Sequence, residues 1–307
     1  MKKKMNKVSV SAPGKLMLLG EHAVVYGYPC LVTAVNKRIS VTVEKIDSDK
    51  ISFNFSVNSK SDFVQKAVAL FFRKYNLRSG LLITTSSGFP PTLGLGSSSA
   101  VTVATLKALC EIFEIKLSKA RLFDLAFEVI TGFQELSSGF DLAAAIYGGT
   151  VYYRKNSVPE ILPFKRIPLL VVYSGVKADT SSMIDSVAQL KKSYPGKINK
   201  IFNQIGVLVE KAKIACRLSD WQTLGKLFNL NQEKLAELGV STDSIDRLVY
   251  TAQKTGALGA KLSGAGGGDC ILVLYNPELK NTLITALTEA NGKIIELNLD
   301  QKGIIVK

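Results

Sequence analysis

The residues best suited to chemistry lie in a glycine- and serine-rich stretch, FPPTLGLGSSSA, at positions 89–100. It follows an apolar run at 81–83 that is typical of a strand, and it precedes 101–109, which predicts a buried helix. A strand, a glycine turn and a helix start together aim several backbone N–H groups at one anion. Gly94 and Gly96 would let a phosphate approach closely. The stretch therefore predicts a phosphate-binding loop, and the alternative is a well-capped helix after an ordinary loop.

Four further features could carry chemistry. Lys15 falls in a predicted Pro-Gly-Lys turn between two strands, where a lysine can stabilise charge on a transferring phosphate. His22, next to Glu21, is the only histidine, so any histidine-dependent triad would have to use it. Asp141 follows a Ser-Ser-Gly-Phe turn and is either a base or a helix cap. Residues 263–268 hold four glycines, which suits close approach to a ligand or to another backbone.

Composition narrows the class of protein. The chain has 307 residues, 39 basic and 25 acidic, with a formal net charge of +14 that favours anionic partners. No run is long and apolar enough to cross a bilayer, and Gly14 and Lys15 interrupt any signal-peptide core, so a cytoplasmic protein is expected. The four cysteines are far apart and lack the CxxC spacing of zinc sites, which indicates reduced core residues.

The order of predicted elements indicates an α+β protein with two domains. Strands and helices are mixed in both halves, with Ser118 and Ser244 as predicted helix caps. A segment with two prolines and no clear period, 156–163, predicts the boundary. We therefore expect domains at 1–157 and 158–307.

Three motifs together resemble those of one enzyme family. SAPGKLMLLGEHAVVYG, PPTLGLGSSSA and KLSGAGGGDC resemble, in this order, the three motifs of the GHMP kinases. The GEHAVVYG part, and NQEKLAELGVSTDSIDRL before the third motif, are similar to mevalonate kinases within that family. The resemblance covers nearly the whole chain. It implies an N-terminal domain like ribosomal protein S5 domain 2, a ferredoxin-like C-terminal domain, and ATP- and Mg²⁺-dependent phosphorylation of the 5-hydroxyl of mevalonate.

The resemblance also implies roles for individual residues. Asp141 would take the proton from the attacking hydroxyl, and Lys15 would orient that hydroxyl and offset charge. Ser98 would contact Mg²⁺. The residues expected to bind ATP are Pro91, Gly94, Leu95, Gly96, Ser97, Ser98 and Ser99. Those expected to shape the substrate pocket are Glu21, His22, Thr180, Gly264, Ala265 and Gly266.

The sequence departs from the family pattern at the second metal ligand. Mevalonate kinases usually carry a carboxylate there, and an ungapped register puts Ile130 at that position. Either Glu128 or Glu135 substitutes after a local shift, with Glu128 as the candidate, or Ser98, phosphates and water hold the metal.

The identity of the substrate is open at this stage. SSGFDLAAAIYGG at 137–149 and Asp269 resemble phosphomevalonate kinases, whereas GEHAVVYG favours mevalonate. The expected partners are a small-molecule substrate and ATP, without nucleic acid or membrane, and a homodimer is left open. A basic nucleic-acid-binding protein is the remote alternative, disfavoured because the lysines are not interleaved with aromatic residues.

Overall fold

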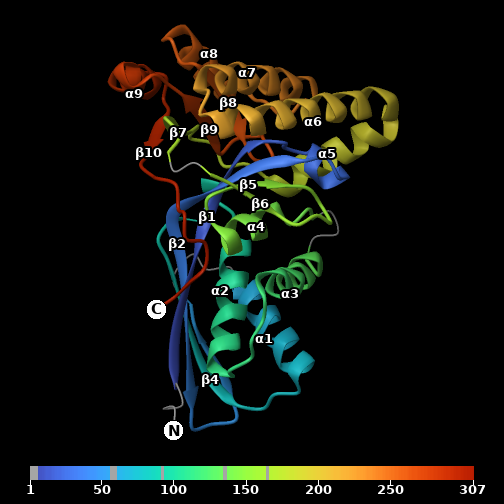
Figure 1. Cartoon of the computed structure of the whole chain (residues 1–307), viewed down its shortest axis with the longest axis vertical. Helices are drawn as coiled ribbons and strands as arrows, with labels where there is room; N and C mark the ends of the chain where they lie inside the picture. The colour runs from blue at the N-terminus through green and yellow to red at the C-terminus, as the bar shows by residue number, and fades with distance from the viewer. Residues whose placement is uncertain (1–5, 56–60, 91–92, 134–136, 164–165) are drawn as a thin grey trace.

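Strands and helices are mixed in both halves of the elongated molecule, which confirms the α+β class (Figure 1). The structure is a computed structural model that describes residues 6–55, 61–90, 93–133, 137–163 and 166–307. Pro91 and Glu135 lie outside these ranges. Within the described residues, no helix combines the length and the apolar character that a membrane crossing requires. The four cysteines are free and buried, as expected.

The first sheet forms the lower part of the molecule in Figure 1. Its strand order is β11-β1-β2-β4-β3, and β5 and β6 extend it beside β2. The pairs are antiparallel except for β3 and β4. The strands are β1 (Lys7–Leu19), β2 (Cys30–Ile46), β3 (Ile51–Asn54), β4 (Gly80–Ser87), β5 (Thr150–Tyr153), β6 (Glu160–Leu162) and β11 (Ile305–Val306).

The predicted Pro-Gly-Lys turn is wrong, because β1 continues through it as one strand. The register with β2 shifts between Pro13 and Gly14, so the pair of residues makes an irregularity in the strand instead of reversing the chain. A Cβ at Gly14 would lie 3.0 Å from the carbonyl oxygen of Leu95. The irregularity therefore brings the backbone before Lys15 against the predicted phosphate loop.

Helices pack on the first sheet and around one buried helix. They are α1 (Ser61–Tyr75), α2 (Ser97–Ile112), α3 (Lys119–Thr131) and α4 (Phe140–Tyr147). α2 packs on β1 and β2 and is buried on nearly every side, as its Ala, Val and Leu content predicts. The buried hydroxyls of Thr102 and Thr105 donate to carbonyl oxygens four residues earlier. Ser118 accepts a hydrogen bond from the Arg121 N–H and caps α3, as predicted.

The second sheet lies in the upper part, with the order β10-β7-β9-β8 and antiparallel pairs throughout. Its strands are β7 (Leu169–Tyr173), β8 (Gly259–Ser263), β9 (Cys270–Leu274) and β10 (Lys293–Ile295). The helices of this part are α5 (Thr180–Ser193), α6 (Pro195–Leu218), α7 (Trp221–Glu237), α8 (Asp243–Lys254) and α9 (Lys280–Glu289), with short 3₁₀ turns at Ala23–Tyr26 and Pro277–Leu279. The predicted cap at Ser244 is wrong, because this residue lies inside α8, whose N-cap position is Thr242.

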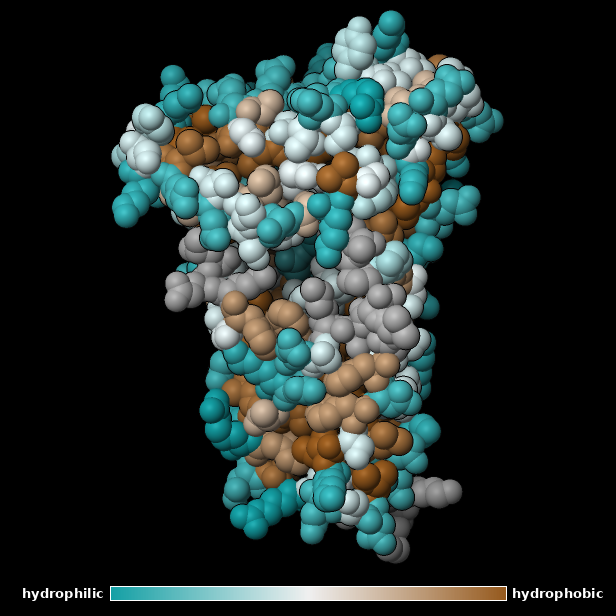
Figure 2. All heavy atoms as spheres, turned by 180° about the vertical axis from the view of Figure 1, so that it is seen from behind, coloured by the Kyte–Doolittle hydropathy of each residue, from teal (hydrophilic) through white to brown (hydrophobic). Residues whose placement is uncertain are grey.

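The two sheets do not divide the chain at residue 157. β6 follows that residue and still pairs with β5, and β11 returns from the far end of the chain to pair with β1. A division by sheets falls between β6 and β7, with β11 added to the first part. Seen from behind, a hollow that shows hydrophilic residues separates the broad upper part from the narrower lower part (Figure 2).

Arg38 on β2 fastens the returning segment to the first sheet. Its Nη2 donates to the carbonyl oxygens of Ser11, at 2.7 Å, and Gly303, at 2.6 Å, and its Nη1 donates to Asp300. The Arg38 and Asp300 side chains are only 18% and 9% exposed. Loss of the guanidinium would therefore leave a nearly buried carboxylate without its cation.

We expect Arg38→Met to lower the free energy of unfolding by about 2–4 kcal/mol, because a buried acceptor and charge lose their partner. Urea denaturation followed by circular dichroism measures this change. Lys302→Met removes a positive charge from an exposed position of the same returning segment and serves as the control. Equal unfolding midpoints for the two variants would contradict the role given to Arg38.

Candidate active site

The start of α2 offers free backbone donors. Its N-cap residue, Gly96, has φ +71° and supplies no side-chain cap. Gly94 before it also has a positive φ, +66°. The first N–H groups of an uncapped helix are available to an anion, and the helix dipole favours negative charge there. The geometry predicted for the phosphate loop is therefore present.

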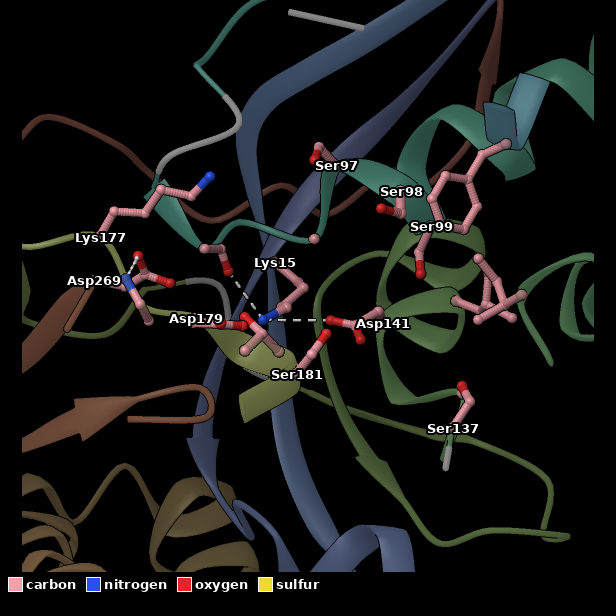
Figure 3. A pocket seen from close by; sticks show the side chains of 18 residues that line it. Lys15, Ser97, Ser98, Ser99, Ser137, Asp141, Lys177, Asp179, Ser181 and Asp269 are labelled. Carbon is pink, nitrogen blue, oxygen red and sulfur yellow. Dashed lines mark hydrogen bonds and ion pairs between the residues drawn. The ribbon is translucent and has the colours of Figure 1, made fainter. Parts of the chain in front are cut away.

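Lys15 is held at the mouth of this loop. Its backbone N–H donates to the Leu95 carbonyl oxygen at 2.9 Å, and its Nζ donates to the Gly94 carbonyl oxygen at 3.1 Å. The ammonium also lies 5.3 Å from the centre of the Phe140 ring. Although the residue is only 7% exposed, its charged end reaches the cavity (Figure 3).

Asp141 faces Lys15 from the first turn of α4. Its Oδ1 lies 3.3 Å from Lys15 Nζ, although the residues are far apart in sequence (Figure 3). Gly139, with φ +86°, starts the helix and lets the chain turn into it. Oδ1 is buried and accepts no hydrogen bond within the described residues. The pair thus joins an anchored cation to a carboxylate with spare acceptor capacity.

Only glycine suits position 96 in this arrangement. A Cβ there would lie 3.0 Å from Lys15 Cγ and 3.2 Å from Asp141 Oδ1, and it would also be strained by the positive φ. The N-cap of α2 therefore touches both charged side chains.

A cavity of about 520 Å³ opens over the start of α2, within the range of small-molecule sites. Of the residues predicted for the site, the described ones that line it are Lys15, Gly94, Gly96, Ser97, Ser98, Ser99, Asp141 and Thr180. A second cavity of about 140 Å³ shares part of this lining and is also bordered by Glu21, His22, Gly264 and Ala265.

Of the predicted site residues that the structure describes, three do not border either cavity. Leu95 is buried and contributes through its backbone carbonyl, which accepts from Lys15. Gly266 packs against Val240, whose carbonyl oxygen leaves no room for a Cβ. Glu128 lies on α3, where it pairs with Lys74 at 3.3 Å and its side chain is 49% exposed.

Glu128 does not line the larger cavity, so we do not retain it as a metal ligand. Ile130, at the position where a carboxylate was expected, lines the larger cavity instead. Among the residues that the structure describes, no group of three or more His, Cys, Asp or Glu side chains could hold a metal. Any metal here would depend on few protein ligands.

Glu21 lies in the wall of the smaller cavity, but both of its carboxylate oxygens accept hydrogen bonds from other side chains. Its Oε1 accepts from Lys261, and its Oε2 accepts from Asn231 Nδ2 at 3.1 Å. Lys261 and Asn231 are fully buried, and Glu21 is 1% exposed. Burial lowers the pKa of Lys261, while the Glu21 carboxylate opposes that shift. Glu21, which follows β1 of the first sheet, therefore links that sheet to α7 and β8 in the second part of the molecule.

His22 is oriented by the third glycine turn. Its Nε2–H donates to the carbonyl oxygen of Ala265 at 2.8 Å, which assigns the proton because a carbonyl only accepts. Burial lowers the pKa of His22, more than the Ala265 hydrogen bond and the Glu21 charge raise it. The ring is therefore neutral near pH 7, and Nδ1 remains as an acceptor beside the smaller cavity.

Asp269 is a site residue that the sequence reasoning did not select. It lines both cavities, and its Oδ1 accepts from the Ala178 N–H at 3.1 Å. Burial raises the pKa of its carboxyl, opposed by the Ala178 hydrogen bond and by Lys15 and Lys177. In the sequence, an aspartate that directly follows three consecutive glycines could have indicated this residue.

The segment before α5 contributes more residues to the site than the sequence predicts. Thr180 is the residue predicted there, and Lys177, Asp179 and Ser181 also line the larger cavity (Figure 3). A cluster of short polar residues and one lysine ahead of a predicted helix was the available signal. That this cluster faces the phosphate loop could not be predicted, because the two segments are far apart in the chain.

We expect Glu21→Gln to lower the free energy of unfolding by about 3–5 kcal/mol, because it leaves the ammonium of Lys261 buried without a counter-charge. Chemical denaturation measures the loss. Glu128→Gln breaks an exposed pair and should change stability by less than about 1 kcal/mol. Glu21→Gln combined with Lys261→Met should recover part of the loss, and strict additivity of the two single changes would contradict the pairing.

Comparison with known proteins agrees with this geometry. Residues 62–149 match the GHMP kinases N terminal domain, residues 212–293 the GHMP kinases C terminal domain, and residues 2–45 the galactokinase galactose-binding signature. The mevalonate kinase of Pyrococcus abyssi is 33% identical over 98% of both chains. The L. major mevalonate kinase in complex with R-mevalonate superposes with a TM-score of 0.83 at 26% identity, covering 98% of this chain and 99% of that one.

A Streptococcus pneumoniae phosphomevalonate kinase has the same fold, with a TM-score of 0.83 and 21% identity over 96% of this chain and all of that one. This match bears on fold alone, whereas the Pyrococcus abyssi mevalonate kinase is 33% identical along nearly the whole chain. The expected two-domain fold is therefore confirmed. The chain belongs to the GHMP kinase family and is similar, from end to end, to its mevalonate kinases.

Proposed function

We propose that this protein transfers the γ-phosphoryl group of ATP to the 5-hydroxyl of mevalonate in isoprenoid precursor biosynthesis. The observation that carries the proposal is the 3.3 Å pairing of Lys15 with Asp141 beside the uncapped start of α2, in one cavity. Phosphoryl transfer depends mainly on positioning and on stabilisation of charge, and this arrangement offers both. We infer that the substrate is mevalonate from the similarity to proteins named mevalonate kinase.

The residues present fit a magnesium ion bound mainly through the nucleotide. Asp141 Oδ1 is a buried acceptor without a hydrogen-bond donor, and Ser98 lines the same cavity. Mg²⁺ commonly keeps several waters and takes one or two protein oxygens plus phosphate oxygens. Ser98 and Asp141 would hold it, and the bound ion would neutralise charge on the phosphates.

The chain's own groups account for proton transfer. As the 5-oxygen of mevalonate bonds to the γ-phosphorus, the bond from that phosphorus to the β,γ-bridging oxygen breaks and ADP leaves. The hydroxyl proton passes to Asp141 Oδ2, the oxygen that does not face Lys15. Lys15, fixed by the Gly94 carbonyl, stabilises the developing charge and limits movement of the hydroxyl.

Charge in the smaller cavity favours mevalonate over 5-phosphomevalonate. Among its described lining residues, Lys15 is the positively charged one, and it already faces Asp141. Asp269 adds a carboxylate, and His22 is neutral near pH 7. A phosphate dianion in place of the hydroxyl would add charge here without a matching cation, which is costly in a confined site.

His22 supports the same assignment. Its Nδ1 is an acceptor at the cavity wall, suited to a substrate hydroxyl. The apolar side chains of Met17, Val24 and Val25 border the same space and suit a short carbon chain. The two groups proposed for catalysis, Asp141 and Lys15, come from the same chain. We place the reaction in the cytoplasm, where ATP is supplied.

We expect Asp141→Asn and Lys15→Met each to reduce kcat by about 10²-fold or more, because each removes a proton acceptor or a stabilising charge. Steady-state turnover of mevalonate and ATP measures the loss. Glu128→Gln, an acidic change outside the cavity, should retain wild-type turnover. Turnover near the wild-type rate in both site variants would discard the roles given to Asp141 and Lys15.

Substrate choice is tested by ADP release from the wild-type enzyme with mevalonate, 5-phosphomevalonate, homoserine or galactose as acceptor. We expect turnover with mevalonate, and kcat/KM lower by at least about 10²-fold for 5-phosphomevalonate because of its unmatched charge. Activity with 5-phosphomevalonate alone would replace the proposal by its sister reaction. ADP release with none of the four would reject this substrate class.

A further inference from the structure

The segment from Ser174 to Asp179 is fastened to the third glycine turn at several points. The backbone N–H of Ser174 donates to the Asp269 carbonyl at 2.8 Å, and the Asp269 N–H donates to the Val176 carbonyl at 2.8 Å. The Asp269 side chain accepts from the Ala178 N–H at 3.1 Å. A Cβ on Gly268 would lie 2.6 Å from the Val176 carbonyl oxygen, so the two segments are in close contact.

Lys177 lies between two of these fastened residues. Val176 and Ala178 are both held by Asp269, so the backbone of Lys177 has little freedom. On its other side, the Asp179 carboxylate caps α5 by accepting from the Ser182 N–H at 3.2 Å. Asp269 is therefore a positioning residue for this segment, and Lys177 is presented from a rigid support.

The side chain of Lys177 is exposed and lines the larger cavity. It extends from the opposite wall toward the side where Ser97 lies (Figure 3). Within the described part of the chain, its Nζ has neither a hydrogen bond nor an ion pair, and its charge is one of the influences that lower the pKa of the Asp269 carboxyl, against the larger effect of burial. Lys15, by contrast, already faces Asp141.

The two walls of the cavity therefore offer complementary groups for one polyanion. One wall presents the uncapped start of α2. The opposite wall, formed by the segment before α5, presents the ammonium of Lys177. A phosphate chain lying over Ser97, Ser98 and Ser99 would pass between them. A lysine is a compact charge on a flexible stem, and it suits a phosphate chain that is not held at one fixed angle.

We infer that Lys177 is a nucleotide-binding residue. Its ammonium binds the phosphate chain of ATP from the second half of the molecule, opposite the phosphate loop that precedes α2. This inference rests on the proposed kinase function and adds a cation that neither the sequence motifs nor the family comparison assigned. It makes the bound nucleotide a bridge between the two parts of the protein.

The test is nucleotide binding by isothermal titration calorimetry, without mevalonate. We expect Lys177→Met to weaken ATP binding by about 10-fold and to leave adenosine binding unchanged, because only the phosphates meet the charge. Lys177→Arg should restore most of the affinity. Lys192→Met, the same charge change at an exposed position near the other end of α5, should bind ATP like the wild type. The difference between Lys177→Met and the wild type should shrink as KCl is raised.

Equal ATP affinity in Lys177→Met and the wild type would overturn the inference, and so would a matching loss of adenosine affinity. Neither result would affect the mevalonate assignment, which the turnover assay tests separately. A wild-type protein that binds no ATP would overturn this inference and the proposed kinase function together.

Discussion

One short electrostatic contact, between the ammonium of Lys15 and the carboxylate of Asp141, sets the geometry of the whole site. The ammonium also holds the Gly94 carbonyl, so three separate segments converge on a single charge. The irregularity in β1 brings in the lysine, the glycine turn supplies the carbonyl, and the start of α4 supplies the carboxylate. Movement of any one segment would alter at least one of these two contacts, and each segment is anchored in a buried core.

The local features of the site could be predicted from sequence because they depend on neighbouring residues. Gly94 and Gly96 indicated positive φ before a helix, and both have it. Ser118 was expected to cap a helix because its hydroxyl reaches a donor three residues away, and it does. The apolar run after Ser99 indicated a helix buried on most sides, as α2 is. Each of these outcomes is decided within a few residues of chain.

Features that depend on distant residues could not be predicted in this way. Glu21 was assigned to the substrate pocket, but its partners Asn231 and Lys261 lie more than 200 residues away and only folding brings them together. Asp269 and Lys177 lie in the site because hydrogen bonds join the third glycine turn to the segment before α5. The turn expected before Lys15 failed because pairing with β2 outweighs the local preference of Pro-Gly for a turn.

The pairing of β11 with β1 has a consequence for how the protein is made. The strand β1 cannot pair with β11 until the ribosome has synthesised some 290 further residues. Arg38 likewise has no Asp300 or Gly303 to bind until that stage. While the ribosome is still translating the second half, the nascent first half therefore exposes an open strand edge and an unpaired guanidinium. Completion of the earliest-made part of the molecule is thus coupled to the last-made part, so the two halves are not independent folding units.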